Sequence, residues 1–327
     1  MTVPCTNAYP GLRIAVILPC FNEAGAIATV IADCKAVLPH AVIHVFDNNS
    51  TDDTAAVART HGARVTHVPL RGKGNVVRRM FADVEADVYV MVDGDATYDV
   101  SKAAQMIDRL VSENLDMVVG ARFDDGRNPQ TYRPGHRLGN TLLTSAVSAL
   151  FGGRFKDMLS GYRIFSRRYV KSFPAAAHGF ETETELTVHA LELRMPYLEF
   201  PAAYLARPVG TQSKLSTFRD GWRILGTIVR LFVSERPLAF FSVLAGGLAL
   251  LSVVLAVPLV FEYLRTGLVP RQPTALLCVG TMLSAMLAQA SGAILHTVTL
   301  GRQEAKRLIY LSIPAPLFSA HAESAPR

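Results

Sequence analysis

Residues 13–23, RIAVILPCFNE, and residues 87–95, DVYVMVDGD, decide the fold. Each stretch contains a short run of mostly aliphatic residues that ends abruptly in polar side chains. An apolar run of this length indicates a strand that is buried on both faces, as in a parallel sheet covered by helices. Ligands of such sheets bind beyond the carboxyl ends of the strands, so the polar residues after each run are the first candidates for a functional site.

The first 125 residues alternate strand-like runs with amphipathic stretches, a pattern that predicts an α/β fold with a mostly parallel central sheet. The glycine-rich sequences of dinucleotide-binding and P-loop proteins do not occur at the strand ends. The expected strands are Arg13–Leu18, Val42–Phe46, Arg64–Val68, Asp87–Val92 and Asp116–Gly120, and the expected helices are Ile27–Leu38, Thr51–His61, Asn75–Asp83 and Ser101–Asn114.

The composition indicates a protein that is not wholly water-soluble. Of 327 residues, 50% are hydrophobic and 18% are charged, whereas soluble domains carry about 25% charged residues. The net charge of +6 suits nucleic acid, an anionic membrane or phosphorylated ligands, and does not choose between them. The four cysteines form no C-x-x-C pair, which argues against a zinc site or a disulfide scaffold.

Two stretches without charged residues lie near the C-terminus, at Leu238–Phe261 and Ala275–Leu300. At about 1.5 Å per residue, each helix would exceed a bilayer core of about 30 Å, so we expect a transmembrane hairpin. Basic residues are concentrated outside the hairpin and would place both termini in the cytoplasm, beneath an inner or plasma membrane. They are Arg219, Arg223, Arg230 and Arg236 before it and Arg302, Lys306 and Arg307 after it, against Arg265 and Arg271 in the connection.

Small residues in the second stretch predict close helix packing. Ser284, Ala288 and Gly292 are spaced four apart, which suits contact within the hairpin or between copies of the chain in a homo-oligomer. Apolar residues between Phe218 and Val233 recur every three or four positions with arginines between them, as in a helix at a membrane surface. The expected organisation is a first domain at residues 1–216, an interfacial helix at 217–236, a hairpin at 237–302 and a cytoplasmic tail at 303–327.

Asp93 and Asp95 follow the apolar run at Val88–Val92 and should project from the carboxyl edge of the sheet. Two carboxylates so close together repel each other unless a cation neutralises them. Their hard oxygen atoms suit Mg²⁺ or Mn²⁺ bridged to substrate phosphates. The acidic and amide residues of Asp47–Asp52 follow another strand, where turn and helix-cap chemistry explains them equally well.

Four motifs, Pro19–Glu23, Asp47–Asp52, Asp93–Asp95 and Gly120–Arg122, resemble in order and spacing the inverting GT-A glycosyltransferases of family two. Residues 157–163, DMLSGYR, with Ser213–Leu215 and the terminal spans, are similar to the branch of dolichyl-phosphate mannose synthases and bacterial polyprenyl-phosphate glycosyltransferases. The resemblance implies a GT-A catalytic domain. It also implies transfer of one sugar from a UDP- or GDP-linked donor to a polyprenyl phosphate, with inversion, on the cytoplasmic membrane face.

The resemblance further implies roles for individual residues. Asn48 stands where many relatives have a second Asp, and Thr97 replaces a common Gln, so a third metal ligand at that position is in doubt. Arg122 and Lys214 are expected beside the transferring phosphates, and Asp157 is expected to orient the acceptor or to act as a base. The expected nucleotide-sugar contacts are Pro19, Phe21, Glu23, Asp47, Asn49, Lys73 and Asp93, and the expected ligands of Mg²⁺ or Mn²⁺ are Asp93 and Asp95.

A basic segment, Arg127–Arg137, leads into the apolar, helix-like stretch Thr141–Phe151. We expect Arg133 and Arg137 to bind the phosphate of the lipid acceptor, with a solvated loop as the alternative. Glu181, Glu183 and Glu185 open a later helix, where acidic side chains complement the helix dipole, and a structural role is expected for all three.

Two other functions stay open. A polysaccharide synthase would share the catalytic domain, but the chain lacks the Q-x-x-R-W motif. The non-enzymatic alternative is a membrane-tethered protein that binds nucleotide sugars without turnover, and the intact Asp93, Asp95 and Arg122 argue against it. Nucleic acid is not an expected partner, because the basic residues are concentrated beside the apolar spans.

Overall fold

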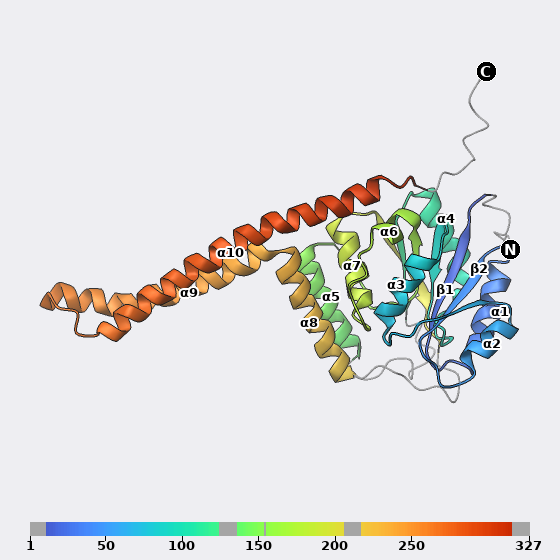
Figure 1. Ribbon diagram of the computed structural model, residues 1–327, viewed down its shortest axis with the longest axis horizontal. Helices are drawn as coiled ribbons and strands as arrows, with labels where there is room; N and C mark the ends of the chain where they lie inside the picture. The colour runs from blue at the N-terminus through green and yellow to red at the C-terminus, as the bar shows by residue number, and fades with distance from the viewer. Residues whose placement is uncertain (1–10, 124–135, 154, 206–216, 316–327) are drawn as a thin grey trace, which may run out of the picture. The chain divides into compact units, whose positions relative to one another are not determined.

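The computed structural model describes residues 11–123, 136–153, 155–205 and 217–315 (Figure 1). The chain forms two compact units: residues up to Ile228 together with those from Lys306 onward, and Val229–Ala305. Helix α8 (Thr217–Glu235), predicted as a segment of its own, is divided between these units. The predicted tail from residue 303 begins inside helix α10 (Gln272–Leu311).

A seven-stranded sheet forms the centre of the first unit, in the order β3-β2-β1-β4-β6-β5-β7. Strand β6 runs antiparallel to β4 and β5, and the other neighbouring strands are parallel. The predicted α/β fold with a mostly parallel sheet is confirmed. The strands are β1 Ile14–Cys20, β2 Val42–Asp47, β3 Arg64–His67, β4 Val88–Met91, β5 Met117–Phe123, β6 Arg163–Ser166 and β7 Tyr197–Ala203.

The last two strands were not predicted, for different reasons. Strand β6 has four residues, all buried, and so short a run has no periodicity that separates strand from helix. Strand β7 contains Pro201 and Glu199, which argue against a central strand. Among the described residues it lies at the edge of the sheet, next to β5, and an edge strand is where a sheet tolerates proline.

Helices cover both faces of the sheet. Buried residues of α1 and α4 pack on one face together with Ala58 of α2. On the other face, the ring of Phe81 in α3 meets those of Tyr89, Phe165 and Phe173 edge-on. The helices of this unit are α1 Ile27–Val37, α2 Thr54–Thr60, α3 Lys73–Asp83, α4 Ala103–Ser112 after the short 3₁₀ helix Val100–Lys102, α5 His136–Phe151, α6 Arg167–Ser172 and α7 Thr182–Glu192.

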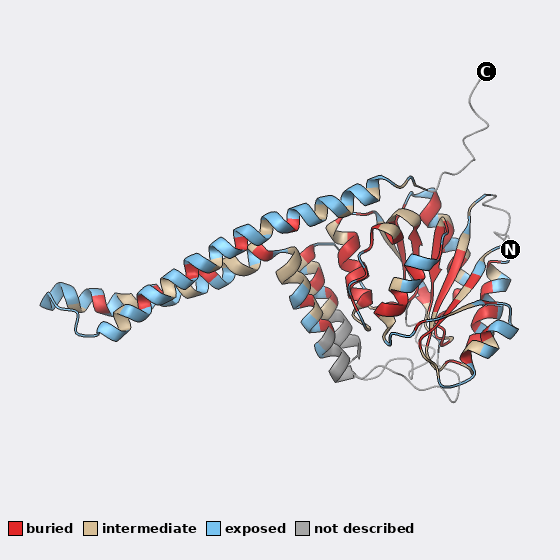
Figure 2. Cartoon of the chain, in the orientation of Figure 1, coloured by how far each residue is buried: buried red, intermediate tan, exposed pale blue. Residues whose placement is uncertain are grey.

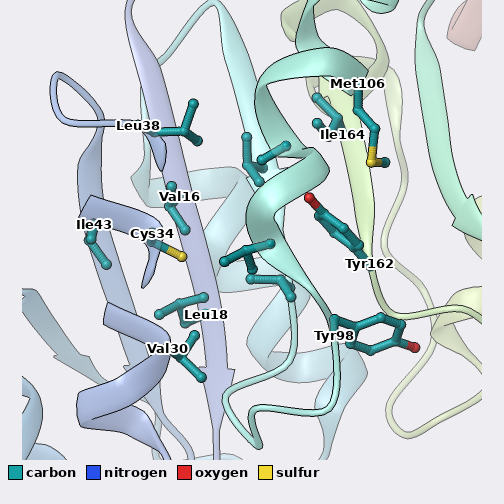
Figure 3. Close-up of a cluster of buried hydrophobic side chains, with 14 of the residues drawn as sticks. Val16, Leu18, Val30, Cys34, Leu38, Ile43, Tyr98, Met106, Tyr162 and Ile164 are labelled. Atoms are coloured by element: carbon teal, nitrogen blue, oxygen red, sulfur yellow. The ribbon is translucent and has the colours of Figure 1, made fainter. Parts of the chain in front are cut away.

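Helix α1 illustrates how the sequence pattern builds the core. Its buried residues include Val30 and Cys34, one turn apart, which lie against Val16 and Leu18 of β1 (Figure 3). Alternate residues of β1 point to this face, and Ile17 between them is buried on the other. The sheet is therefore buried on both sides, as its apolar runs predict.

The parallel order places the carboxyl ends of β1, β2, β4 and β5 at one edge of the sheet. Strand β6 runs in the opposite direction, so its first residue, Arg163, pairs with Met91 of β4 and Val119 of β5 near that same edge. The connection that precedes β6, residues 157–162, therefore reaches the edge as well.

The second unit contains α9 (Pro237–Thr266) and the greater part of α10. Their most apolar windows have mean hydropathies of 2.6 and 1.5, and 17% of each window is buried. Figure 2 shows that most of the surface of both helices is exposed. Both are long and apolar enough to cross a membrane, and they are not buried like the core helices of the first unit.

The two long helices meet along a seam of mostly small residues spaced seven apart. Of the predicted ridge, Gly292 belongs to this seam, whereas Ser284 is exposed. Contact through the ridge between copies of the chain stays a prediction. A seven-residue spacing is typical of two helices that wind around each other, since seven residues make nearly two turns. A Cβ at Gly292 would lie 2.7 Å from the Cβ of Phe241, and Ser252 Oγ donates to the carbonyl oxygen of Cys278 at 2.7 Å. The seam consists of Ala245, Ser252 and Leu259 in α9 and Cys278, Ala285, Gly292 and Thr299 in α10.

The C-terminal turns of α10 pack on the first unit. Tyr310 Oη donates to Oδ2 of the buried Asp116 at 2.7 Å, and the Arg168 guanidinium lies 4.9 Å from the Tyr310 ring centroid. Lys306 Nζ lies 2.9 Å from Glu192 Oε2 at the end of α7. These contacts explain why the residues after 305 belong to the unit that contains the sheet.

We predict that Tyr310→Phe lowers the stability of this unit by about 1–3 kcal/mol. The variant removes the hydrogen bond that Tyr310 donates to a buried carboxylate oxygen of Asp116. Thermal unfolding of the detergent-solubilised full chain measures the loss. Tyr263→Phe is the matched control, since Tyr263 is 53% exposed in α9. Equal melting temperatures for Tyr310→Phe and the wild type would show that the Tyr310 contact is not stabilising.

Candidate active site

The metal-motif carboxylates follow the end of β4. The Asp93 side chain is 26% exposed and Asp95 is buried. Oδ1 of Asp95 accepts from the backbone nitrogen and the hydroxyl of Thr97, at 3.2 and 2.6 Å. A Cβ at Gly94 would lie 2.5 Å from Cys20 Sγ. Only glycine therefore fits between the two carboxylates, and Thr97 orients Asp95.

Lys73, the first residue of α3, connects two carboxylates. Its ammonium lies 2.6 Å from Asp93 Oδ1 and 2.6 Å from Glu183 Oε1, with only 10% of the side chain exposed. Burial lowers the pKa of Lys73, but the two carboxylates raise it by more and keep it above its usual value. The side chain is an ammonium group that neutralises part of the charge beside the metal motif.

Glu183 is the site residue that the sequence analysis missed. It was assigned with Glu181 and Glu185 to the helix dipole, but the three acids have separate contacts. Glu185 accepts from two backbone N–H groups at 2.8 Å each, and Glu181 accepts from those of residues 178 and 179. The sequence contained an indication of this role. Glu183 shares the inner face of α7 with Leu186 and Ala190, and a carboxylate buried there without a partner would be costly.

Arg122, which is partly exposed, and the buried Asp157 form a bidentate pair. Arg122 Nε and one terminal nitrogen each donate to Asp157 at 2.7 Å, and the Arg122 backbone nitrogen donates at 3.1 Å. The Asp157 backbone nitrogen donates to Glu199 Oε1 at 2.9 Å. Both carboxylate oxygens of Asp157 accept from Arg122, so this carboxylate holds Arg122 in place. The predicted role of Asp157 as acceptor-orienting group or base stays a prediction.

The turn before β6 packs directly on the metal motif. A Cβ at Gly161 would lie 2.4 Å from Asp93 Oδ2. The backbone nitrogen of Gly161 donates to Tyr98 Oη at 2.9 Å, and burial raises the pKa of Tyr98, which stays a phenol. The contact leaves no room for a side chain and limits the movement of Asp93.

The predicted nucleotide contacts lie at the same edge of the sheet. Pro19 lies within β1, and Phe21 follows that strand with its ring 5.6 Å from the Arg71 guanidinium. Asp47 and Glu23 are buried. The Asn49 amide donates to the Pro69 carbonyl at 2.6 Å.

The asparagines after β2 support the segment that leads to Lys73. The Asn48 amide donates to the carbonyls of Val68 and Leu70, and its oxygen accepts from the Gly72 nitrogen at 2.7 Å. Asn49 therefore braces the same segment as Asn48, a contact that does not itself test its predicted role toward the nucleotide sugar.

Three predicted residues are not placed in the site. Arg133 and Lys214 lie outside the described residues. Arg137 lies in the first turn of α5, which begins at His136, five residues earlier than the predicted helix. The backbone of Arg137 is therefore helical rather than part of the expected loop, and its side chain is outside the description.

A divalent cation would have two carboxylate ligands here. Among the described residues, no three His, Cys, Asp or Glu side chains are grouped so as to hold a metal ion. Asp93 and Asp95 fit Mg²⁺ or Mn²⁺, which commonly take one or two carboxylates and complete their coordination with water and substrate phosphates. The arrangement suits a cation that binds together with a diphosphate.

We predict that Gly161→Ala weakens Mn²⁺ binding in the presence of UDP or GDP about tenfold, because the new methyl group displaces Asp93. The electron paramagnetic resonance signal of free Mn²⁺ measures the affinity. Gly25→Ala is the control, since a Cβ there meets nothing within 4 Å. Unchanged affinity in folded Gly161→Ala would mean that this contact does not orient Asp93.

Comparison with known proteins identifies the fold and the relatives. Residues 15–173 match Glycosyl transferase family 2. Glycosyltransferase AglJ of Haloferax volcanii is 35% identical over 230 residues, which are 70% of this chain and 75% of that protein. Dolichyl-phosphate hexose transferase of the same organism is 27% identical over 223 residues, 68% of this chain and 95% of that protein.

Among solved structures, glucosyl-3-phosphoglycerate synthase from Mycobacterium tuberculosis in complex with phosphoglyceric acid aligns with a TM-score of 0.53 at 25% identity. The alignment covers 67% of this chain and 80% of that one. The first unit therefore has the GT-A fold.

Proposed function

Because the chain belongs to glycosyl transferase family 2 and is thus a glycosyltransferase that uses nucleotide sugars, we propose that it transfers one sugar to a polyprenyl phosphate. The observation that carries this proposal is that one chain joins the GT-A unit to two exposed helices long enough to cross a membrane. Such helices keep an enzyme beside a lipid acceptor. The likeness to a dolichyl-phosphate hexose transferase supports the same class of acceptor.

The donor binds along the carboxyl edge of the sheet in this proposal. Phe21, Glu23 and Asp47 contact the nucleoside, and Asn49 lies beside them. Asp93 and Asp95 hold Mg²⁺ or Mn²⁺, which when bound offsets the charge that develops on the leaving diphosphate. Lys73 adds a fixed positive charge next to Asp93.

The reaction is a single displacement. A phosphate oxygen of the acceptor attacks the anomeric carbon and forms the new C–O bond, while the bond from that carbon to the diphosphate oxygen breaks. The nucleoside diphosphate leaves with the electron pair, and the configuration inverts. The attacking oxygen is already largely ionised near neutral pH, so a strong general base is not obligatory, and Asp157 is the residue that orients the acceptor or acts as base. Arg122, held by Asp157, and Lys214 stabilise charge on the phosphates.

The membrane arrangement completes the proposal. Helices α9 and α10 span an inner or plasma membrane, with the basic flanks and the GT-A unit on the cytoplasmic side. In helix α8, Ile224 and Ile228 are buried, whereas Trp222 is 73% exposed. An exposed tryptophan on a helix that precedes a span suits the headgroup region of the bilayer. Copies of the chain associate through the exposed faces of the hairpin.

The proposal predicts that membranes containing the chain transfer label from a UDP- or GDP-sugar to a short polyprenyl phosphate, giving a product that extracts into organic solvent. Asp95→Asn should abolish most of this transfer. Arg133→Ala and Arg137→Ala should each raise the apparent KM for the lipid phosphate about 10- to 100-fold, because each removes a charge-assisted hydrogen bond of about 1.5–3 kcal/mol.

Calorimetric titration of the same variants with nucleotide supplies the control, and donor affinity should be unchanged in both arginine variants. Parallel reactions contain 3-phosphoglycerate or an oligosaccharide in place of the lipid. Transfer to either of these but not to polyprenyl phosphate would contradict the proposal, and the oligosaccharide result would favour the synthase alternative.

A further inference from the structure

Arg163 is completely buried, although the mechanism above gives it no role. It opens β6 between the strand that leads to Asp93 and the strand that carries Arg122. Fully buried arginines are normally paired with a carboxylate. In the described part of the chain, no carboxylate forms an ion pair with Arg163. The free-energy cost of burying this cation must therefore be offset by contacts other than an ion pair.

The guanidinium of Arg163 joins two segments that are distant in sequence. Nε donates to the Ser160 carbonyl at 2.9 Å, and a terminal nitrogen donates to the Met158 carbonyl. Two other contacts are on α7, to the Glu183 carbonyl at 3.2 Å and to Thr187 Oγ1 at 3.1 Å. A terminal nitrogen also contacts Met117 Sδ of β5 at 3.5 Å. One rigid side chain therefore holds the turn before β6 against the first turns of α7.

Each of these two segments supports one oxygen of Asp93. The turn carries Gly161, whose Cβ position lies 2.4 Å from Asp93 Oδ2. Helix α7 carries Glu183, which shares the Lys73 ammonium with Asp93 Oδ1. The same guanidinium therefore contacts both segments that support this carboxylate.

Arg163 also adds a positive charge near the carboxylates of the site. Four carboxylates, those of Asp93, Asp95, Glu183 and Asp157, lie at the site with two cations, Lys73 and Arg122. Burial lowers the pKa of Arg163, while nearby groups that include Glu183 and Asp157 oppose the shift. The guanidinium remains protonated in proteins, so its charge offsets part of the excess of negative charge at the site.

We propose that Arg163 is the positioning residue for Asp93: by tying the turn 158–160 to α7, it holds the metal-motif carboxylate in place from both sides. The inference rests on the proposed function, because it takes Asp93 as a metal ligand. Arg163 itself touches neither metal nor substrate. Residues that orient metal ligands typically alter metal affinity about 10- to 100-fold when substituted.

The test measures Mn²⁺ affinity of the purified full chain in detergent, with UDP or GDP present, by electron paramagnetic resonance. Arg163→Lys keeps the charge but loses the planar fork, and should weaken Mn²⁺ binding about tenfold or more. Thr187→Val removes one partner of Arg163 in a side chain of similar shape. It should weaken binding in the same direction by a smaller factor, and it tests the proposal if Arg163→Lys does not fold.

Arg168→Lys is the matched control. Arg168 pairs with Asp116, which precedes β5 and therefore lies at the end of that strand opposite Arg122. Weakening this ion pair should lower the melting temperature without changing Mn²⁺ affinity. Wild-type affinity in both folded Arg163→Lys and Thr187→Val would overturn the inference. Asp93→Asn separates this result from failure of the proposed function: if it leaves Mn²⁺ binding unchanged, Asp93 is not a metal ligand at all.

Discussion

The ammonium group of Lys73 lies between the carboxylates of Asp93 and Glu183, 2.6 Å from each. These residues begin α3, follow β4 and lie in the first turn of α7, so one charge joins three elements. Without the Lys73 ammonium, the buried carboxylate of Glu183 and the partly exposed carboxylate of Asp93 would repel each other. Removing one member of such a buried ion pair typically costs about 3–5 kcal/mol, because the remaining charge loses its partner.

The antiparallel strand β6 is the second constraint on the site. A parallel strand in its place would have brought its carboxyl end to the edge where β4 and β5 end. Because β6 runs the other way, the connection before it arrives there instead. That connection supplies Asp157 to Arg122 and Gly161 to Asp93, and thus joins the proposed phosphate side of the site to the metal side.

The sequence predicted the features that follow from apolar runs and from the parallel-sheet rule: five strands, the α/β fold, and the placement of Asp47, Asp93 and Arg122 at one edge. It did not predict β6, whose four residues carry no usable period, or the role of Glu183, whose neighbours are also acidic and lie at a helix start. Within the hairpin, α9 and α10 meet along a seven-residue spacing rather than the four-residue ridge, because helix winding selects that spacing, and contact through the ridge between copies stays a prediction. The roles of Lys214 and Arg133 stay predictions, since both residues lie outside the described part of the chain.

The Lys73–Glu183 ion pair joins α3 to α7 beside Asp93, and the site depends on this contact. A double-mutant cycle with Lys73→Met, Glu183→Gln and the combined variant tests it most directly, with stability measured by urea unfolding of the detergent-solubilised full chain. The account predicts that the combined variant loses less stability than the sum of the single variants, with a coupling energy of about 1–3 kcal/mol. Losses that add to within about 0.5 kcal/mol would contradict it.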